Sequence, residues 1–154
     1  MTDISRILSA RKPLTLSGAP TGFLPLLLAD LARAAAGGGA PTRAVFIAPD
    51  ELAMQAVADT AGWFAPELDV IAIPAWDCLP YDRASPSLRS AAQRLAGLHA
   101  LSAPVTAPQL VLTTAAAITQ RTLTPFRVRQ LVARLAPGER IAIEALTKLL
   151  QANG

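Results

Sequence analysis

The chain has 154 residues, 52% of them hydrophobic, which suits one compact domain, or one domain and a fragment, and excludes a disordered chain. Its net charge of +3 comes from twelve arginines and only two lysines, Lys12 and Lys148. The arginines are dispersed, so no basic run indicates a dedicated nucleic-acid site, and a solvated surface is the simpler interpretation.

A single cysteine and the character of the amino terminus favour a cytoplasmic protein. Cys78 stands alone, which excludes a disulfide framework and a cysteine-rich metal site. The first residues lack the basic-then-apolar order of a signal peptide. The uncharged stretch between Arg94 and Arg121 is interrupted by Pro104 and Pro108, so we expect a buried helix, a turn and a strand there. No membrane contact is predicted.

Strand and helix patterns alternate along the chain up to about residue 121. The strand segments lack polar alternation, which is typical of a parallel sheet covered on both faces. Asp50, Ser87 and Thr114 are suited to N-cap the helices that follow them, and Gly37–Gly39 form a turn. Strands are predicted over residues 14–17, 43–48, 68–73 and 109–113, and helices over residues 22–36, 51–61, 88–101 and shortly after 114. The predicted fold class is α/β, an open, mostly parallel sheet flanked by helices and joined by right-handed crossovers.

The helix predicted after Ser87 has two faces. Its apolar residues recur at the helical period and are expected to face the core. These are Leu88, Ala91, Ala92, Leu95, Leu98 and Leu101. Arg89, Gln93 and Arg94 are expected on another face. His99, the one histidine, is predicted to be partly buried and not a general base, because no cysteine or acid is evidently paired with it.

Residues 74–86 contain three prolines, which exclude both a helix and a central strand, so an ordered loop is predicted. Its two aromatic residues, Trp76 and Tyr81, are expected to act as anchors that cap the core. The alternative is a recognition surface, because loops at strand ends often carry function. Asp77 and Asp82 are expected to cap the loop or form salt bridges, since no partner residues indicate a catalytic pair.

Arg83, Arg89 and Arg94 are the cationic residues nearest to this loop. Arginine grips carboxylate or phosphate with a planar fork, and aromatic rings add stacking area, so a partner-contacting patch is one possibility. The preferred interpretation is an exposed helix face paired with the two loop acids.

Open α/β sheets that bind nucleotides often have a phosphate-binding loop after the first strand. In this chain the segment at that position is Ser17–Pro25. A working loop reads G-x-x-x-x-G-K-[ST]. Counted from Gly18, the last three positions are Phe23, Leu24 and Pro25, with Gly22 just before them. Close backbone approach, the lysine charge and the magnesium ligand are all lost. We therefore predict a dismantled nucleotide site. The chain is predicted to have no catalytic residue, cofactor or metal ligand.

The amino-acid composition changes around residues 121–125, where the uncharged stretch ends and arginines become frequent. Phe126–Arg134 is a strand-like segment with arginines at Arg127, Arg129 and Arg134, and a helix is predicted over about 141–152. One strand and one helix cannot bury a core alone. We therefore predict one domain over residues 1–121 and the truncated beginning of a second over residues 122–154.

The proline-rich loop carries a specific sequence motif that continues into the next helix. It reads Trp76-Asp77-x-Leu79-Pro80-Tyr81-Asp82-x-x-Ser85-Pro86, followed by Ala92-x-Arg94-Leu95. The flanking segments are Val45-Phe46-Ile47-Ala48-Pro49-Asp50 and Leu110-Val111-Leu112-Thr113-Thr114 through Gln120-Arg121. Over nearly its whole length the chain resembles the amino-terminal module of bacterial transcription-repair coupling factors (Mfd). That module is itself similar to the UvrB subunit of nucleotide excision repair.

The resemblance implies a degenerate P-loop fold like domain 1a of UvrB, followed by the start of a small α+β domain of the UvrA-binding type. It implies a non-catalytic scaffold whose parent protein releases stalled RNA polymerase by ATP-driven DNA translocation and recruits UvrA. ATP, magnesium, DNA and RNA polymerase would engage other modules of the parent, while this piece belongs to the recruiting and autoinhibitory end. The family's main UvrA contacts lie beyond Gly154, so Trp76, Tyr81, Arg83, Arg127, Arg129 and Arg134 are only candidate partner-binding residues.

Two other function classes stay open at this point. One is a UvrB-like ATPase or helicase fragment with an unusual nucleotide site, which the lack of a phosphate-loop lysine disfavours. The other is a stand-alone DNA-binding module that uses its arginines, whose affinity would fall steeply as salt rises.

Overall fold

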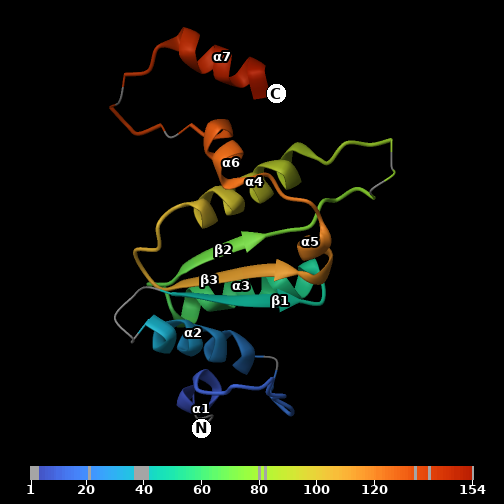
Figure 1. The fold of residues 1–154 in the computed structure, drawn as a ribbon, viewed down its shortest axis with the longest axis vertical. Helices are drawn as coiled ribbons and strands as arrows, with labels where there is room; N and C mark the ends of the chain where they lie inside the picture. The colour runs from blue at the N-terminus through green and yellow to red at the C-terminus, as the bar shows by residue number, and fades with distance from the viewer. Residues whose placement is uncertain are drawn as a thin grey trace.

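A three-stranded parallel sheet forms the centre of the computed structural model, which describes residues 4–20, 22–36, 42–79, 81, 83–133, 135–138 and 140–153. Its strands are β1 (Arg43–Ala48), β2 (Asp69–Ile73) and β3 (Gln109–Thr114), in the spatial order β1-β3-β2 (Figure 1). β3 pairs with both neighbours in parallel, so Gln109 lies beside both Arg43 and Asp69. The α/β class and the open parallel sheet are confirmed.

Side-chain caps set the starts of several helices. Asp50 accepts a bond from the Ala53 N–H at 2.8 Å, and Ser87 and Thr114 cap their helices in the same way. All three predicted caps are confirmed. The helices are α1 (Ile4–Leu8), α2 (Phe23–Ala36), α3 (Glu51–Phe64), α4 (Leu88–Ser102), α5 (Ala115–Thr119), α6 (Pro125–Leu131) and α7 (Ile143–Asn153).

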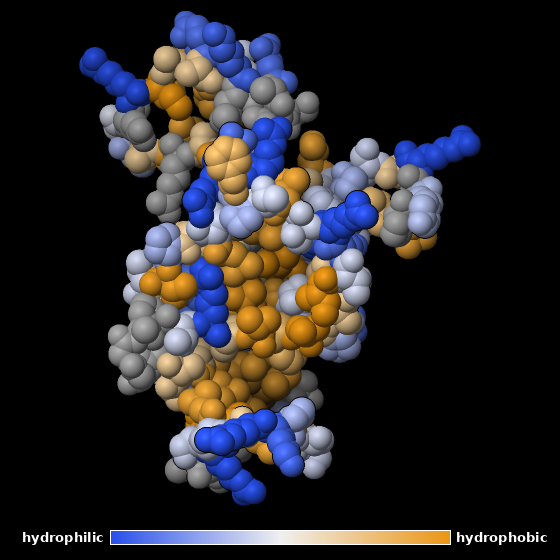
Figure 2. Space-filling view, in the orientation of Figure 1, coloured by the Kyte–Doolittle hydropathy of each residue, from blue (hydrophilic) through white to orange (hydrophobic). Residues whose placement is uncertain are grey.

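The helices cover the two faces of the sheet unequally. α2 and α3 pack on one face around buried residues such as Leu28, Met54 and Leu112. On the other face, α4 covers a smaller cluster over β2 and β3. Val45 and Ile47 of β1 remain 61% and 49% exposed, and Figure 2 shows apolar surface across the middle of the molecule. The prediction of two covered faces is therefore correct for one face, and on the other it is correct over β2 and β3 but not over β1.

The predicted first strand, Leu14–Ser17, is wrong. The segment is irregular and exposed, with Leu14 and Leu16 each 50% exposed. It runs near α1, on the side of α2 away from the sheet (Figure 1). A strand needs a neighbour that satisfies its backbone groups, and among the described residues no strand lies beside the segment. The predicted Gly37–Gly39 turn lies outside the described residues.

The strand predicted over Phe126–Arg134 is also wrong, because the segment begins as the helix α6. Thr124 caps it by accepting the Arg127 N–H at 3.3 Å, and Pro125 occupies its first turn, as helix starts favour. Val128, 1% exposed, is buried where α6 packs against α4. The helix predicted near the end is confirmed as α7. The domain boundary after Arg121 stays a prediction.

Candidate functional site

The proline-rich loop leaves β2 at the carboxyl end of the parallel strands, where open α/β sheets place their sites. Two side chains from separate helical regions hold the first residues of the loop, Pro74–Trp76, which we call the loop root. The Ala75 N–H donates to Glu51 Oε1 at 2.7 Å, and the Trp76 N–H donates to Gln120 Oε1 at 3.0 Å. The root is thereby tied to the start of α3 and the end of α5.

Arg94 of α4 also forms a hydrogen bond to the loop root. Its guanidinium donates to the Pro74 carbonyl at 2.7 Å and to the Ala117 carbonyl at 3.3 Å, and only 1% of the residue is exposed. It also lies 5.2 Å from the centroid of the Trp76 ring, within cation–π range. Burial lowers the pKa of Arg94, while the negative charge of Glu51 acts in the opposite direction.

The buried face of α4 agrees with the predicted one in part. Leu98 and Leu101 pack against the smaller cluster, as expected, whereas Leu88 is 90% exposed. The most deeply buried residues of the helix are Ser90, Arg94 and Gly97. Gly97 allows the close approach, since a Cβ built there would lie 2.6 Å from the Ala72 carbonyl oxygen. The prediction that Arg94 lies on an exposed face paired with loop acids is wrong, because its bonds go to two backbone carbonyls.

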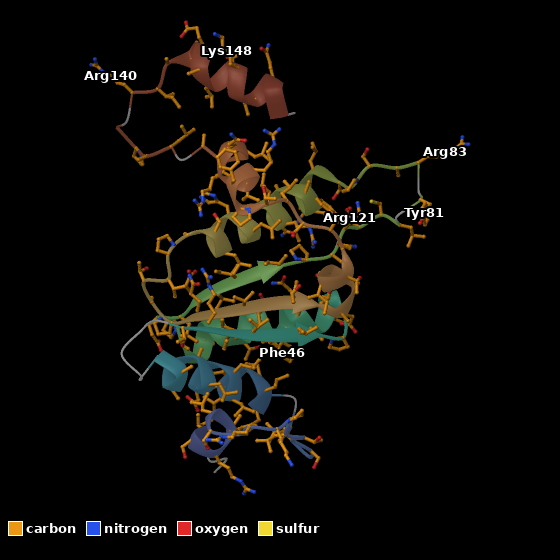
Figure 3. The ribbon with its side chains drawn as sticks, in the orientation of Figure 1. Phe46, Tyr81, Arg83, Arg121, Arg140 and Lys148 are labelled. Atoms are coloured by element: carbon orange, nitrogen blue, oxygen red, sulfur yellow. The ribbon has the colours of Figure 1, made fainter. Side chains whose placement is uncertain are left out.

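The loop tip, in contrast, projects away from the body. Figure 3 shows Tyr81 and Arg83 at the end of this projection, and Tyr81 is 99% exposed. The anchor prediction is therefore confirmed for half-buried Trp76, whose ring lies over Arg94, and wrong for Tyr81, because this residue is almost fully exposed. Asp77 caps the loop by accepting the Ser87 N–H at 3.0 Å. Hydrogen bonding by Ser87, first through its side chain and then through its N–H, lowers the pKa of Asp77. Asp82 lies outside the described residues.

A pocket of about 400 Å³ opens beside the loop root, between α4, α6 and the segment after α5. Its walls are mostly apolar, and among the described residues that line it, Arg94 and Arg121 carry charge. The lining consists of Trp76, Ala91, Arg94, Leu95, Leu98, Arg121, Thr122, Leu123 and Leu131. Sequence reasoning missed this pocket. No local pattern indicated it, because its described lining comes from the loop, α4, α6 and the segment after α5, which are far apart in the sequence.

The segment predicted as a dismantled phosphate loop forms an apolar turn at the start of α2. Gly18 has a φ of +71°, and the Phe23 N–H donates to the Pro20 carbonyl at 2.9 Å. Gly22 is exposed, Phe23 and Leu24 are half-buried, and Pro25 is buried in the first helical turn. Pro25 has no N–H, and that of Phe23 is used internally, so neither can donate to a phosphate.

The remaining candidate arginines do not gather at one site. Arg127 bonds to Gln130 Oε1 at 3.2 Å within α6, and Arg129 donates to the Ser102 carbonyl at 3.1 Å. Both are therefore held by neighbours, whereas Arg83 is exposed at the loop tip. Arg134 lies outside the described residues. His99 is partly buried on α4, as predicted.

Replacing Trp76 or Tyr81 with alanine separates the two parts of the loop. Trp76→Ala is expected to lower the free energy of unfolding by about 2–3 kcal/mol, because a half-buried ring that covers Arg94 is lost. Tyr81→Ala should change it by less than about 0.5 kcal/mol, because the ring is exposed. Urea unfolding of both variants checks this. Equal losses would contradict the division into a fixed root and an exposed tip.

Comparison of the chain with protein-family models, with curated proteins and with solved structures finds no match. Within the described ranges, no group of three or more histidine, cysteine, aspartate or glutamate residues is placed to hold a metal ion. Over the same residues, no helix has the length and apolar character needed to cross a bilayer.

Proposed function

We propose that the chain is a non-catalytic, UvrB-like scaffold module of a transcription-repair coupling factor. In this role it links the release of stalled RNA polymerase to the recruitment of nucleotide excision repair through UvrA. The motif Trp76-Asp77-x-Leu79-Pro80-Tyr81 and its continuation into α4 are the basis of the proposal. The module contributes binding surface, and ATP and DNA are handled by other modules of the parent protein.

One observation supports the non-catalytic part of the proposal: the segment that was compared with the phosphate-loop motif, Ser17–Pro25, forms an apolar turn at the start of α2. Pro25 is buried in the first turn of α2, and the adjoining hollow is lined by residues 16–20 with Phe23 and Leu27. Phosphate binding requires free backbone donors and a cation there. Neither Lys12, which precedes this segment, nor Lys148, near the far end of the chain, occupies the lysine position of the motif.

The loop tip supports a role in partner binding. Leu79 and Tyr81 are 72% and 99% exposed on a projection whose root is fixed by Glu51, Gln120 and Arg94. Exposed tyrosines are frequent at the energetic centres of interfaces, and a fixed root limits the entropy lost on binding. This arrangement suits a scaffold better than an enzyme.

Calorimetric titration of Mg-ATP into the chain at low salt tests the non-catalytic assignment, and we expect no binding heat. In parallel, the immobilised chain is exposed to purified UvrA and to the purified motor fragment of a coupling factor. Saturable binding of either one is expected, and an unrelated ATPase serves as the control. Saturable one-to-one ATP binding, or binding to neither partner, would overturn the proposal. In the first case the enzyme alternative becomes the better explanation.

A further inference from the structure

The pocket beside the loop root combines positive charge with apolar walls. Its volume of about 400 Å³ lies in the range of small-ligand sites. Two of its lining residues, Arg94 and Arg121, are cationic, and none of the described residues that line it is acidic. Metal cations and amines are therefore disfavoured, and an anionic group is the complementary ligand chemistry.

Arg94 is a buried cation without a carboxylate partner among the described residues. The ion pairs within that part of the chain both involve Arg33, far from this pocket. The two bonds of Arg94 go to neutral carbonyls, and its Nε, although buried, has no partner in the described residues. A guanidinium carries five N–H donors, so donors remain for an anion. Burying a charge is costly unless it is paired, and an anion would supply that pairing.

Arg121 provides a second cation at the same pocket. It is exposed and directly follows Gln120, whose side chain is held by the Trp76 N–H at 3.0 Å. The backbone at Arg121 is thereby fixed beside the loop root. No hydrogen bond or ion pair joins its side chain to a described residue. Its guanidinium is therefore available to a ligand that enters the pocket.

The rest of the lining is suited to a hydrocarbon body. The apolar walls are supplied by Trp76, Leu95, Leu98, Leu123 and Leu131, and Thr122 adds a hydroxyl group. A carboxylate is planar and matches the fork of a guanidinium.

We propose that this pocket binds a carboxylate attached to an apolar or aromatic body. Arg94 and Arg121 hold the carboxylate, and the ring of Trp76 and the leucines contact the body. The carboxyl end of a peptide and a free small acid share this chemistry. The site stands independently of the repair-scaffold function, because it depends only on the pocket and its two cations.

Trp76 provides a fluorescent reporter inside the pocket. The chain has two tryptophans, and Trp63 is 88% exposed, so Trp63→Phe leaves Trp76 as the sole reporter. This variant is titrated with N-acetylphenylalanine, which imitates a peptide terminus, and with 4-phenylbutanoate, a free acid. Each is compared with its neutral amide. Saturable fluorescence changes are expected with the acids, and binding at least about tenfold weaker with the amides, since charged hydrogen bonds are lost.

Arginine variants in the same background locate the site. Arg121→Ala is expected to weaken acid binding about tenfold, because one charged donor pair is lost. Arg89→Ala removes the same charge from an exposed position of α4 outside the pocket and should leave binding unchanged. Arg94→Lys keeps the charge but loses the fork, and should also weaken binding. Binding of both acids indicates small acids in general, and binding of the acetylated amino acid alone indicates a peptide terminus.

Three results would overturn the proposal. The first is the absence of a saturable fluorescence change with either acid, and the second is binding of the amides as tight as that of the acids. The third is a loss of acid affinity in Arg89→Ala equal to the loss in Arg121→Ala. The last of these would mean that general surface charge attracts the acids.

Discussion

Replacing Arg94 with alanine is expected to lower the free energy of unfolding by about 3–5 kcal/mol. Two carbonyls, those of Pro74 and Ala117, lose a charged donor, and a large side chain that is 1% exposed leaves a cavity. The substitution also removes the contact with the Trp76 ring. The loop root and α5 should both loosen, because Arg94 is bonded to each of them.

An opposing effect is the cost of keeping an unpaired guanidinium buried. Its removal relieves a desolvation penalty, which in some proteins offsets the loss of buried polar contacts. The penalty is reduced here by the two carbonyl bonds, by the Trp76 ring and by the charge of Glu51. Alanine supplies none of the lost volume, so we expect the losses to dominate.

Arg89→Ala is the matched control, because it removes the same charge from an exposed position of the same helix. Its effect should stay within about 0.5 kcal/mol. For a chain of this size, the Arg94→Ala loss corresponds to a fall in Tm of about 10 °C. Thermal and urea unfolding measure both. Equal stability of the two variants would show that the carbonyl bonds only compensate the burial of the charge.

Local signals in the sequence were sufficient for most of the elements. Asp50, Ser87 and Thr114 were each predicted as caps and each accepts the expected backbone bond. The strands β1, β2 and β3 lie where they were predicted, because uninterrupted apolar runs are a strong signal of buried parallel strands.

The predictions were wrong where the secondary structure of a segment depends on a partner that is distant in the sequence. The apolar stretch Leu14–Ser17 has the composition of a strand but no described strand beside it, so its backbone stays irregular. Phe126–Arg134 has the spacing of a strand, yet the Thr124 cap and Pro125 start a helix that buries Val128 on α4. The cap was the better signal, because it acts within one turn.

The position of the candidate site along the chain could be predicted, but the contacts of its residues could not. The described part of the loop after β2 contains neither helix nor strand, as expected, and Trp76 was correctly expected to be an anchor. The role of Arg94 could not be foreseen, because its acceptors lie 20 and 23 residues away along the chain. Helical periodicity placed it on a polar face, since periodicity scores an arginine as exposed regardless of what its side chain can reach.

The buried face of α4 also depends on a glycine, and Gly97→Ala is expected to be strongly destabilising. The added Cβ would lie 2.6 Å from the Ala72 carbonyl oxygen and 2.9 Å from Ile73 Cγ1. Real Cβ atoms do not approach backbone that closely, so α4 must move away from β2. Such overpacking costs about 1–3 kcal/mol or more, and the shift also weakens the bond of Arg94 to Pro74.

A control at another helical glycine separates this contact from helix propensity. Alanine is favoured over glycine in helices by about 1 kcal/mol, which acts against the expected loss. Gly62 lies in α3, and a Cβ there meets no atom within 4 Å, so Gly62→Ala should raise stability by up to that amount. We expect Gly97→Ala to unfold at lower urea concentration than the parent chain, and Gly62→Ala at higher concentration. If both variants gained stability, α4 would not be seated on β2 through Gly97, and the burial of Arg94 would need another explanation.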